Sequence, residues 1–270
     1  MLAAACALPM RDAPESLAAA ERAFAAQSLR DGMRSAFIVH FAPDGVMVRS
    51  GWVNARAALA TQPEAPFALD WRPVFVETAA SGELGISTGP WRASAAGEAA
   101  GHGQFVSVWR RVDRGPWEVA VDLGISHDGS ALWDAPLAAA TASGTGGAPG
   151  EGIDAAEARF ERDAARHGTA VAYAASAAGT LRLYRDGAPP LIRGRTPNSE
   201  GSGSGPELPL LAWRVERIET ARSADLGYAR GTYASDADPG RALGCFLRIW
   251  RREDGQWRIA LDVMAPTQRR

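Results

Sequence analysis

The sequence predicts an α+β fold in which one domain occurs twice along the chain. A chain of 270 residues is long for one such domain and natural for two domains of about 100 to 150 residues each. One stretch occurs twice, as GQFVSVWRRVDRGPWEVAVDLG at 103–124 and as GCFLRIWRREDGQWRIALDV at 244–263. A helical pattern precedes each copy of this stretch at a similar distance. Together these observations indicate a duplicated domain.

Each copy of the repeated stretch is typical of two β-strands joined by a turn. Asp254-Gly255 in the second copy and Asp113-Arg114-Gly115 in the first tolerate the positive φ angles that a hairpin turn requires. The strand after each turn alternates with a period of two. In the first copy, one face is expected to carry Trp117, Val119, Val121 and Leu123, and the other Glu118, Ala120 and Asp122. In the second copy, the corresponding faces carry Trp257, Ile259, Leu261 and Val263, and Arg258, Ala260 and Asp262. We expect one of the two faces to be core.

The other elements of the first half follow in order. A helix is predicted from about Glu15 to Asp31, where Gly32 gives a C-cap signal. Short helices are predicted over 33–37 and 54–60, and a strand within FAPDGVMVRSG between them. The segments LDWRPVFVETAA and GELGISTGPWRAS then alternate like strands before the repeated hairpin.

The second half repeats this order at nearly the same spacing. Glu157 and Phe160 match Glu21 and Phe24, Trp213 matches Trp71, and Asp262 matches Asp122. Between the halves, residues 128–150 lose all periodicity and end rich in Gly, Ala, Ser and Thr, a composition typical of a flexible linker. The predicted organisation is a leader at 1–14, a domain at 15–127, a linker at 128–150 and a second domain at 151–266.

Composition excludes several classes of protein. Hydrophobic residues make up 46% of the chain and charged residues 22%, which is ordinary for a globular protein. The net charge is -2 and no run of Lys or Arg exceeds a pair, so we expect no nucleic-acid partner. No apolar run approaches the roughly 18 residues of a membrane span. With two cysteines far apart, Cys6 and Cys245, a structural disulfide is not expected.

The first ten residues, MLAAACALPM, allow two interpretations. They resemble the end of a bacterial lipoprotein signal, in which small residues precede a lipidated cysteine, here Cys6. The basic and longer apolar regions that precede such a cysteine are missing, so a flexible Ala-rich leader is the alternative. An upstream signal would place the protein in the periplasm or on a lipid anchor, and without it a cytoplasmic location is expected.

The order of these motifs resembles the SnoaL-like branch of the nuclear transport factor 2-like superfamily. The resemblance rests on E-x-x-F in the first helix, Ala36-Phe37 in the second, a D-G strand, L-x-W before a hairpin with G-x-L-G, and the closing G-x-W-x-V-x-x-D. It covers nearly all of 15–127 and, more loosely, 151–266. It implies two tandem cone-shaped domains, each with N-terminal helices packed on a strongly curved, mostly antiparallel sheet that encloses a pocket. Family members commonly dimerise through their sheets, which implies an intramolecular pseudo-dimer of the two halves.

The resemblance also implies where chemistry would lie. Isomerases of this fold use a pocket carboxylate as base, and the strand carboxylates here are Asp122, the candidate catalytic residue, and Asp262. The alternative for each is a structural aspartate that pairs with an arginine or caps a loop. His40 and Arg49 flank the first strand and could enter the pocket, although a single histidine beside apolar residues is more often structural.

Aromatic side chains are the other candidates for the pocket. Trp71 and Trp91 in the first copy, and Trp213 and Tyr233 in the second, could line it or fill the core. The four histidines show no metal-ligand spacing, so we expect no metal, and no motif implies a cofactor.

Two functions remain open at this point. The first is binding of a small apolar ligand in the pocket, or a part in assembly without chemistry. The second is an isomerase, cyclase or hydrolase that acts on a small organic substrate with a pocket carboxylate as base. Because the first copy matches the motifs more closely, we expect it to hold any active pocket, while the second copy is partly a scaffold.

Overall fold

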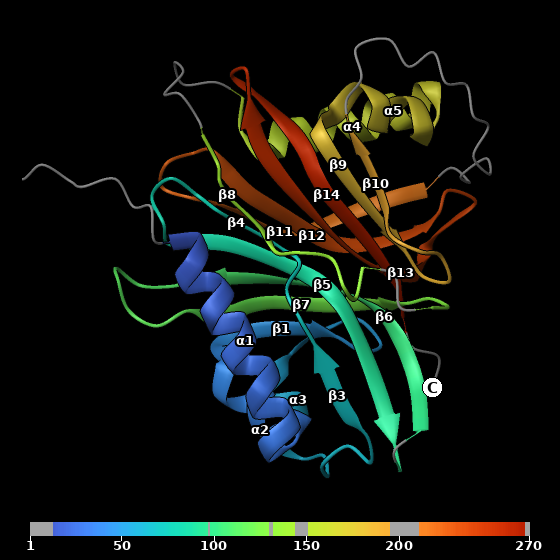
Figure 1. The fold of residues 1–270 in the computed structure, drawn as a ribbon. Helices are drawn as coiled ribbons and strands as arrows, with labels where there is room; N and C mark the ends of the chain where they lie inside the picture. Colours follow the sequence, from blue (N-terminus) through green and yellow to red (C-terminus); the bar gives the residue numbers. More distant parts are fainter. Residues whose placement is uncertain (1–12, 97, 130–131, 144–150, 195–210, 268–270) are drawn as a thin grey trace, which may run out of the picture.

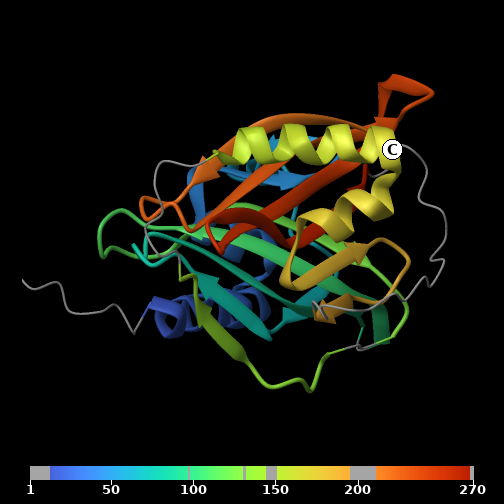
Figure 2. The ribbon, with the colours of Figure 1, turned by 90° about the horizontal axis from the view of Figure 1, so that it is seen from above.

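The structure, a computed structural model, describes residues 13–96, 98–129, 132–143, 151–194 and 211–267. Two curved sheets pack against each other in the middle of the molecule, and helices cover the outer side of each sheet (Figures 1 and 2). The fold is therefore α+β, with two tandem cone-shaped halves, as the sequence predicts. Cys6 and the rest of the predicted lipoprotein signal lie outside the described residues.

The first half contains three helices and one curved sheet. The helices are α1 (Ala13–Asp31), α2 (Met33–His40) and α3 (Ala55–Ala60). The strands are β1 (Phe41–Val48), β2 (Trp52–Asn54), β3 (Ala68–Trp71), β4 (Phe75–Thr78), β5 (Leu84–Ala95), β6 (Glu98–Arg110) and β7 (Glu118–Ser126). Their order in the sheet is β2-β1-β7-β6-β5-β4, with β3 also paired to β5. Asn54 caps α3 by accepting a hydrogen bond from the backbone N–H of Ala57.

The second half repeats the connectivity of the first. Its elements are α4 (Ile153–His167), α5 (Thr169–Ser176), β9 (Ala177–Arg185), β10 (Leu191–Gly194), β11 (Leu211–Thr220), β12 (Leu226–Ser235), β13 (Asp238–Glu253) and β14 (Gln256–Pro266). The strand order β10-β9-β14-β13-β12-β11 matches that of the first sheet. The hairpin between β13 and β14 turns at Asp254 and Gly255, whose φ angles are 50° and 77°, as the Asp-Gly pair predicts.

The segment between the halves differs from the flexible linker expected at 128–150. Strand β8 (Ala138–Thr141) lies in it and pairs in parallel with β4 at the edge of the first sheet. Its residues are mostly exposed, but Ala140 packs against the core between the sheets and Ala142, just after the strand, is buried in it. Residues 144–150 lie outside the described residues. At the N-terminus, helix α1 already begins at Ala13, inside the segment 1–14 expected to be a leader.

A β-bulge in strand β7 shifts which of its residues point toward the helices and which point toward the second sheet. Val121 pairs with Val108, and Val119 pairs with Trp109, so Ala120 is an extra residue without a partner of its own. Before the bulge, Trp117 and Val119 pack toward the helices. After it, Val121, Leu123 and Ile125 pack toward the second sheet. An extra residue shifts the two-residue alternation by one position.

The prediction that Trp117, Val119, Val121 and Leu123 share one face is therefore wrong, because alternation holds only within an unbroken ladder. Strand β14 has the same bulge at Ala260, with Ile259 toward the helices and Leu261 toward the first sheet. The bulge also decides where the carboxylates lie. Asp122 and Asp262 each point to the concave side of their own sheet, opposite to the face that packs against the other half.

A single hydrophobic core joins the convex faces of the two sheets. It includes Ile86, Val108, Val121, Leu123 and Ile125 from the first sheet and Tyr184, Leu226, Leu247, Ile249 and Val263 from the second. Polar contacts at its edge are reciprocal, since Ser81 N–H donates to Ser223 Oγ at 3.2 Å and Ser223 N–H donates to Ser81 Oγ at 3.0 Å. Such mutual contacts are typical of an interface with two-fold symmetry.

We expect the shared core to make the two halves unfold together. Ile249→Ala removes a side chain that is 0% exposed and should lower the free energy of unfolding by about 2–4 kcal/mol, because it leaves a cavity between the sheets. Chemical denaturation followed by tryptophan fluorescence and circular dichroism should still give one transition. The control is Leu243→Ala on the same strand, 42% exposed, which should cost under about 0.5 kcal/mol. Two separate transitions in wild type would contradict the expectation.

Candidate functional site

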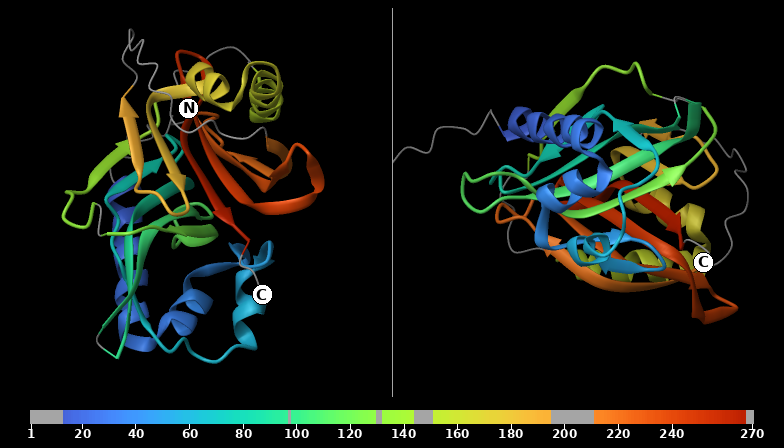
Figure 3. Two further views of the ribbon diagram at one scale, coloured as in Figure 1. Left: turned by 90° about the vertical axis from the view of Figure 1, so that its right-hand side faces the viewer. Right: turned by 90° about the horizontal axis from the view of Figure 1, so that it is seen from below.

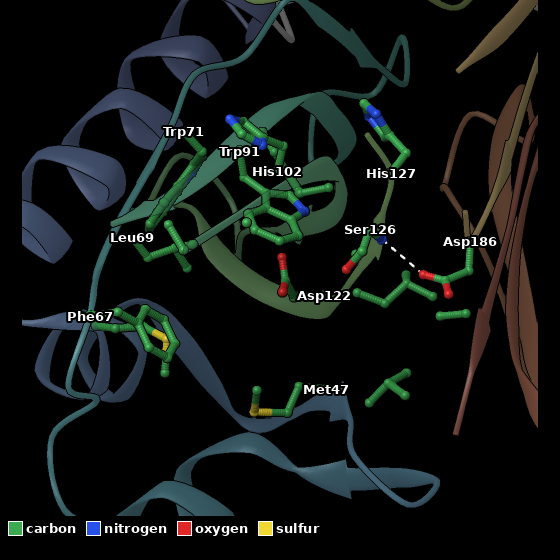
Figure 4. A pocket seen from close by; sticks show the side chains of 18 of the residues that line it. Met47, Phe67, Leu69, Trp71, Trp91, His102, Asp122, Ser126, His127 and Asp186 are labelled. Carbon is green, nitrogen blue, oxygen red and sulfur yellow. Dashed lines mark hydrogen bonds between the residues drawn. The ribbon is translucent and has the colours of Figure 1, made fainter. Parts of the chain in front are cut away.

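A cavity of about 1070 Å³ opens on the concave side of the first sheet. Helices α1 and α2 close one side of it, and strands β3, β5, β6 and β7 form its wall. Figure 4 shows Asp122 in the middle of this wall, next to Trp91, with Leu69 and Trp71 to one side. Most of the lining is apolar or aromatic: Phe24, Met33, Phe37, Met47, Phe67, Leu69, Trp71, Trp91 and Phe105.

The second half completes the mouth of this cavity. The turn after β9 contributes Asp186 and Gly187, and the end of β14 contributes Ala265, Pro266 and Thr267. Strand β14 runs from the second half toward the helices of the first (Figure 3). Asp186 is fixed in place because its Oδ1 accepts a hydrogen bond from the Ser126 N–H at 2.9 Å (Figure 4). The cavity is thus built from both halves.

Asp122 is the acidic group best placed to act on a bound molecule. It is half-buried, and Ser107 Oγ donates a hydrogen bond to its Oδ2 at 2.7 Å. The pKa of Asp122 is raised to about 7, mainly by burial and in smaller part by the nearby Glu21 carboxylate, while the Ser107 hydrogen bond and the Arg49 charge act in the opposite direction. A carboxyl group with this pKa exchanges its proton near neutral pH.

Glu21, a residue of helix α1, is fully buried and near enough to Asp122 to raise its pKa. Its carboxylate accepts hydrogen bonds from Trp71 Nε1 at 2.6 Å, from Trp109 Nε1 at 2.9 Å and from Ser87 Oγ. Burial raises the pKa of Glu21, although these three donors partly compensate. The first half therefore holds two neighbouring acids that are hydrogen-bonded mainly to neutral donors.

The corresponding place in the second half is filled by Arg248. This fully buried arginine lies opposite Asp262 in the β13–β14 ladder, as Ser107 lies opposite Asp122 in the β6–β7 ladder. Its Nε donates to Asp262 Oδ2 at 2.8 Å and its Nη1 to Glu157. The guanidinium carbon lies 4.1 Å from the ring centre of Phe160. Arg248 thus occupies the space that is open in the first half.

Four of the predicted site residues line the cavity: Asp122, Arg49, Trp71 and Trp91. Trp91 closes one side, where its Nε1 donates to the Ile125 carbonyl at 3.1 Å. His40 does not line the cavity. Its ring stacks on Phe24 at 4.8 Å and its Nε2 makes a 3.0 Å hydrogen bond with Gln27 Oε1, because the C-terminal end of α2 turns it toward α1.

The predicted residues of the second half do not line the cavity either. Trp213 packs against Tyr233 at 6.0 Å and against Phe246 at 5.2 Å between ring centres. Asp262 is fully buried and pairs with Arg248 and Arg185, each at 2.8 Å. Trp213 and Asp262 thus pack against the Arg248 side chain, and Tyr233 packs against Trp213.

Several residues of the site were not predicted from the sequence. Ser107 does not itself line the cavity, but it donates a hydrogen bond to Asp122, which does. The repeated stretches differ in chemical type at this position, FVSVW against FLRIW. His127 also lines the cavity, and its Nε2 is buried without a hydrogen-bond partner among the residues that the structure describes. Asp186 could not have been predicted, since it comes from the other half.

Among the residues that the structure describes, no group of three or more His, Cys, Asp and Glu side chains is arranged to hold a metal ion. None of the helices in this part of the chain is both long and apolar enough to span a membrane.

The raised pKa of Asp122 predicts how stability depends on pH. The unfolded chain loses this proton near the ordinary value of 3.8, whereas the folded protein keeps it up to about pH 7. Between these values the folded state binds more protons, so the contribution of Asp122 to stability falls as pH rises. We expect Asp122→Asn to have the same melting temperature as wild type near pH ~4 and a higher one near pH ~8. The exposed Asp128→Asn is the control, and an unchanged difference across this range would refute the assignment.

Neither a protein-family model nor a curated protein matches the chain. Several solved structures resemble part of it. An NTF-2 like protein of unknown function from Shewanella oneidensis is 13% identical, with 41% of this chain and 96% of that chain covered and a TM-score of 0.34. A ketosteroid isomerase-like protein from Erwinia carotovora is 15% identical, with 43% and 97% covered and a TM-score of 0.34. An NTF2-like protein with a cystatin-like fold from Novosphingobium aromaticivorans is 16% identical, with 44% and 85% covered and a TM-score of 0.35.

Proposed function

We propose that the first half of the chain binds a small, mostly apolar organic molecule in its cavity. The observation that carries the proposal is the cavity itself, about 1070 Å³ in volume and lined mainly by aromatic and apolar side chains. Ligand pockets in proteins are typically concave and apolar, with a few polar groups that orient the ligand. Here the polar groups on the wall include Asp122, Arg49, His102 and His127.

The polar groups suggest how a ligand would be oriented. Asp122 Oδ2 already accepts a hydrogen bond from Ser107, and the carboxyl group has further acceptor capacity toward the cavity. His127 Nε2 is buried without a partner in the described residues, so a ligand that hydrogen-bonds to it would relieve the cost of its burial. These two groups lie on opposite sides of Ser126 (Figure 4).

We also propose that the two halves form an intramolecular pseudo-dimer in which the second half is a scaffold and closes the cavity. The shared core and the reciprocal hydrogen bonds of Ser81 and Ser223 support this arrangement. Arg248 supports the scaffold assignment because it fills the space equivalent to the cavity. The single unfolding transition expected for Ile249→Ala tests the pseudo-dimer as well.

Binding in the cavity can be tested with a neutral apolar probe, phenylnaphthylamine, whose fluorescence rises when it leaves water. Leu69→Trp enlarges a side chain on the cavity wall and should weaken binding of the probe at least about tenfold by occupying its space. The control is Val112→Trp in a surface turn, 82% exposed, which should bind like wild type. Native mass spectrometry of the purified protein would reveal any molecule retained from the cell.

Equal binding by wild type, Leu69→Trp and Val112→Trp would place the probe elsewhere and contradict the proposal. Absence of probe binding to wild type, with no retained molecule, would contradict it too. The cavity would then be only a space between the two halves.

A second candidate is acid–base chemistry by Asp122, as in an isomerase, cyclase or hydrolase. The specific observation in its favour is the pKa of about 7, which burial produces. A general base works best when its pKa lies near the working pH, because it is then both available and sufficiently basic. Trp91 and Phe105 on the same wall would shield the reacting atoms from water.

The base competence of Asp122 can be measured with nitrobenzisoxazole, which loses a carbon-bound proton to a base while its N–O bond breaks to give a coloured phenolate. The wild-type rate should rise with pH around a midpoint near 7, and Asp122→Asn should lower it by about 100-fold or more. Asp128→Asn, which changes an exposed carboxylate at the rim, is the matched control. Probe binding without turnover would exclude this second candidate and leave binding as the function.

A further inference from the structure

The two halves place different side chains at one equivalent position of the concave sheet. Ser107 of β6 faces Asp122 of β7, and Arg248 of β13 faces Asp262 of β14. The tryptophan two residues further along each strand is alike in the two halves, since Trp109 and Trp250 both donate to a buried glutamate from the first helix of their half. The Arg248 guanidinium therefore marks a position that remains open in the first half.

We infer that the ligand of the first half carries a compact cation, an ammonium or guanidinium group, which pairs with Asp122 where the Arg248 guanidinium pairs with Asp262. This inference rests on the proposed function and names its ligand class. In the second half, the concave face of the sheet already binds a cation, the Arg248 guanidinium. It binds the guanidinium by ion pairs to Asp262 and Glu157.

Aromatic rings surround the guanidinium in the second half. Its carbon lies 4.1 Å from the ring centre of Phe160, 4.8 Å from Trp213, 5.1 Å from Phe246 and 6.0 Å from Tyr173. Ring faces attract cations within about 6 Å. The equivalent residues of the first half are Phe24, Trp71, Phe105 and Phe37, and all four line the cavity. The first half thus has the same aromatic surroundings without the cation.

Acidic side chains outnumber Lys and Arg side chains around the cavity, which favours binding of a cation. In the second half two acids, Glu157 and Asp262, are met by Arg248 and Arg185. In the first half the acids are Glu21 and Asp122, and Asp128 and Asp186 add two more carboxylates at the rim. Arg49 is the only Lys or Arg side chain among the described residues that line the cavity, beside the titratable His102 and His127.

Glu21 and Asp122 differ in how well they are already satisfied. Glu21 accepts three hydrogen bonds, from Trp71, Trp109 and Ser87. Asp122 lies at the cavity surface and accepts a side-chain hydrogen bond from Ser107. A ligand cation would therefore pair directly with Asp122, while Glu21 adds a longer-range attraction.

The test compares two probes of nearly equal shape, phenylguanidinium and the neutral phenylurea, by calorimetry on the full chain near pH ~8. We expect phenylguanidinium to bind at least about tenfold more tightly, because Asp122 is ionised at this pH. Near pH ~5.5 the preference should shrink, since Asp122 takes up a proton. The neutral probe isolates the contribution of charge from that of apolar contact.

Ser107→Arg gives the first half the arginine that the second half has. Its guanidinium should occupy the proposed cation position and abolish measurable binding of phenylguanidinium. The control is Val112→Arg, which adds the same charge in a surface turn that is 82% exposed, and should bind the probe like wild type. The comparison of the two probes on wild type stands whether or not Ser107→Arg folds.

The possible outcomes separate the two proposals. If both probes bind wild type equally well, the cavity binds ligands but the inference of a cation is wrong. If neither probe binds but phenylnaphthylamine does, the cation inference again fails and the proposed function survives. If none of the three binds, both proposals fail. Retention of phenylguanidinium binding by a folded Ser107→Arg protein would also overturn the cation position.

Discussion

The β-bulge at Ala120 determines where the two functional surfaces of the first sheet lie. Ahead of it, Val119 packs toward the helices, and beyond it Val121 and Leu123 pack against the second sheet. The same shift turns Asp122 away from the interface between the sheets and toward the cavity. With regular alternation and no bulge, Asp122 would lie on the face opposite to Val119, in the apolar core, where an unpaired charge is very costly. Strand β14 carries the same bulge at Ala260, so both halves depend on it.

The two halves show two ways to bury a pair of acids. In the second half, Arg248 bridges Glu157 and Asp262. Burial would by itself lower the pKa of Arg248, but the two carboxylates raise it, so the arginine stays charged. The first half lacks this bridge, and burial instead raises the pKa of Asp122 to about 7. In the second half, ion pairing with Arg248 gives a filled interior. In the first half, Asp122 lies at an open cavity and can exchange its proton near neutral pH.

The sequence predicted the fold because its signals are local and occur twice. The helix that ends at Gly32, the Asp254-Gly255 turn and the repeated tryptophan hairpin each follow from short-range rules. The face of Asp122 could not be predicted, because a bulge depends on the pairing of two strands and leaves no mark in one strand's alternation. Strand β8 was missed for a related reason, since its alanines carry no periodic pattern and pair only because the edge of β4 is available.

Within the candidate site, the residues that could be predicted from the sequence were mainly those with an equivalent residue in the second copy of the repeat. Trp71, Trp91 and Asp122 were found because each has a counterpart in the second half. The same logic also selected Trp213, Tyr233 and Asp262, which do not line the cavity, and two of them, Trp213 and Asp262, contact Arg248 instead. Residues at equivalent positions of a repeat can therefore have different surroundings in the two copies. At one position the first half has Ser107 and the second half has Arg248, which differ in both volume and charge.

The second half contributes to the cavity of the first although its own equivalent position is filled. The turn after β9 and the end of β14 form part of the cavity mouth through Asp186, Gly187 and residues 265–267. Arg248, fully buried and paired with acids on α4 and β14, joins the sheet that carries these segments to its own helix. The ion pairs inside the second half and the cavity of the first therefore belong to one connected structure.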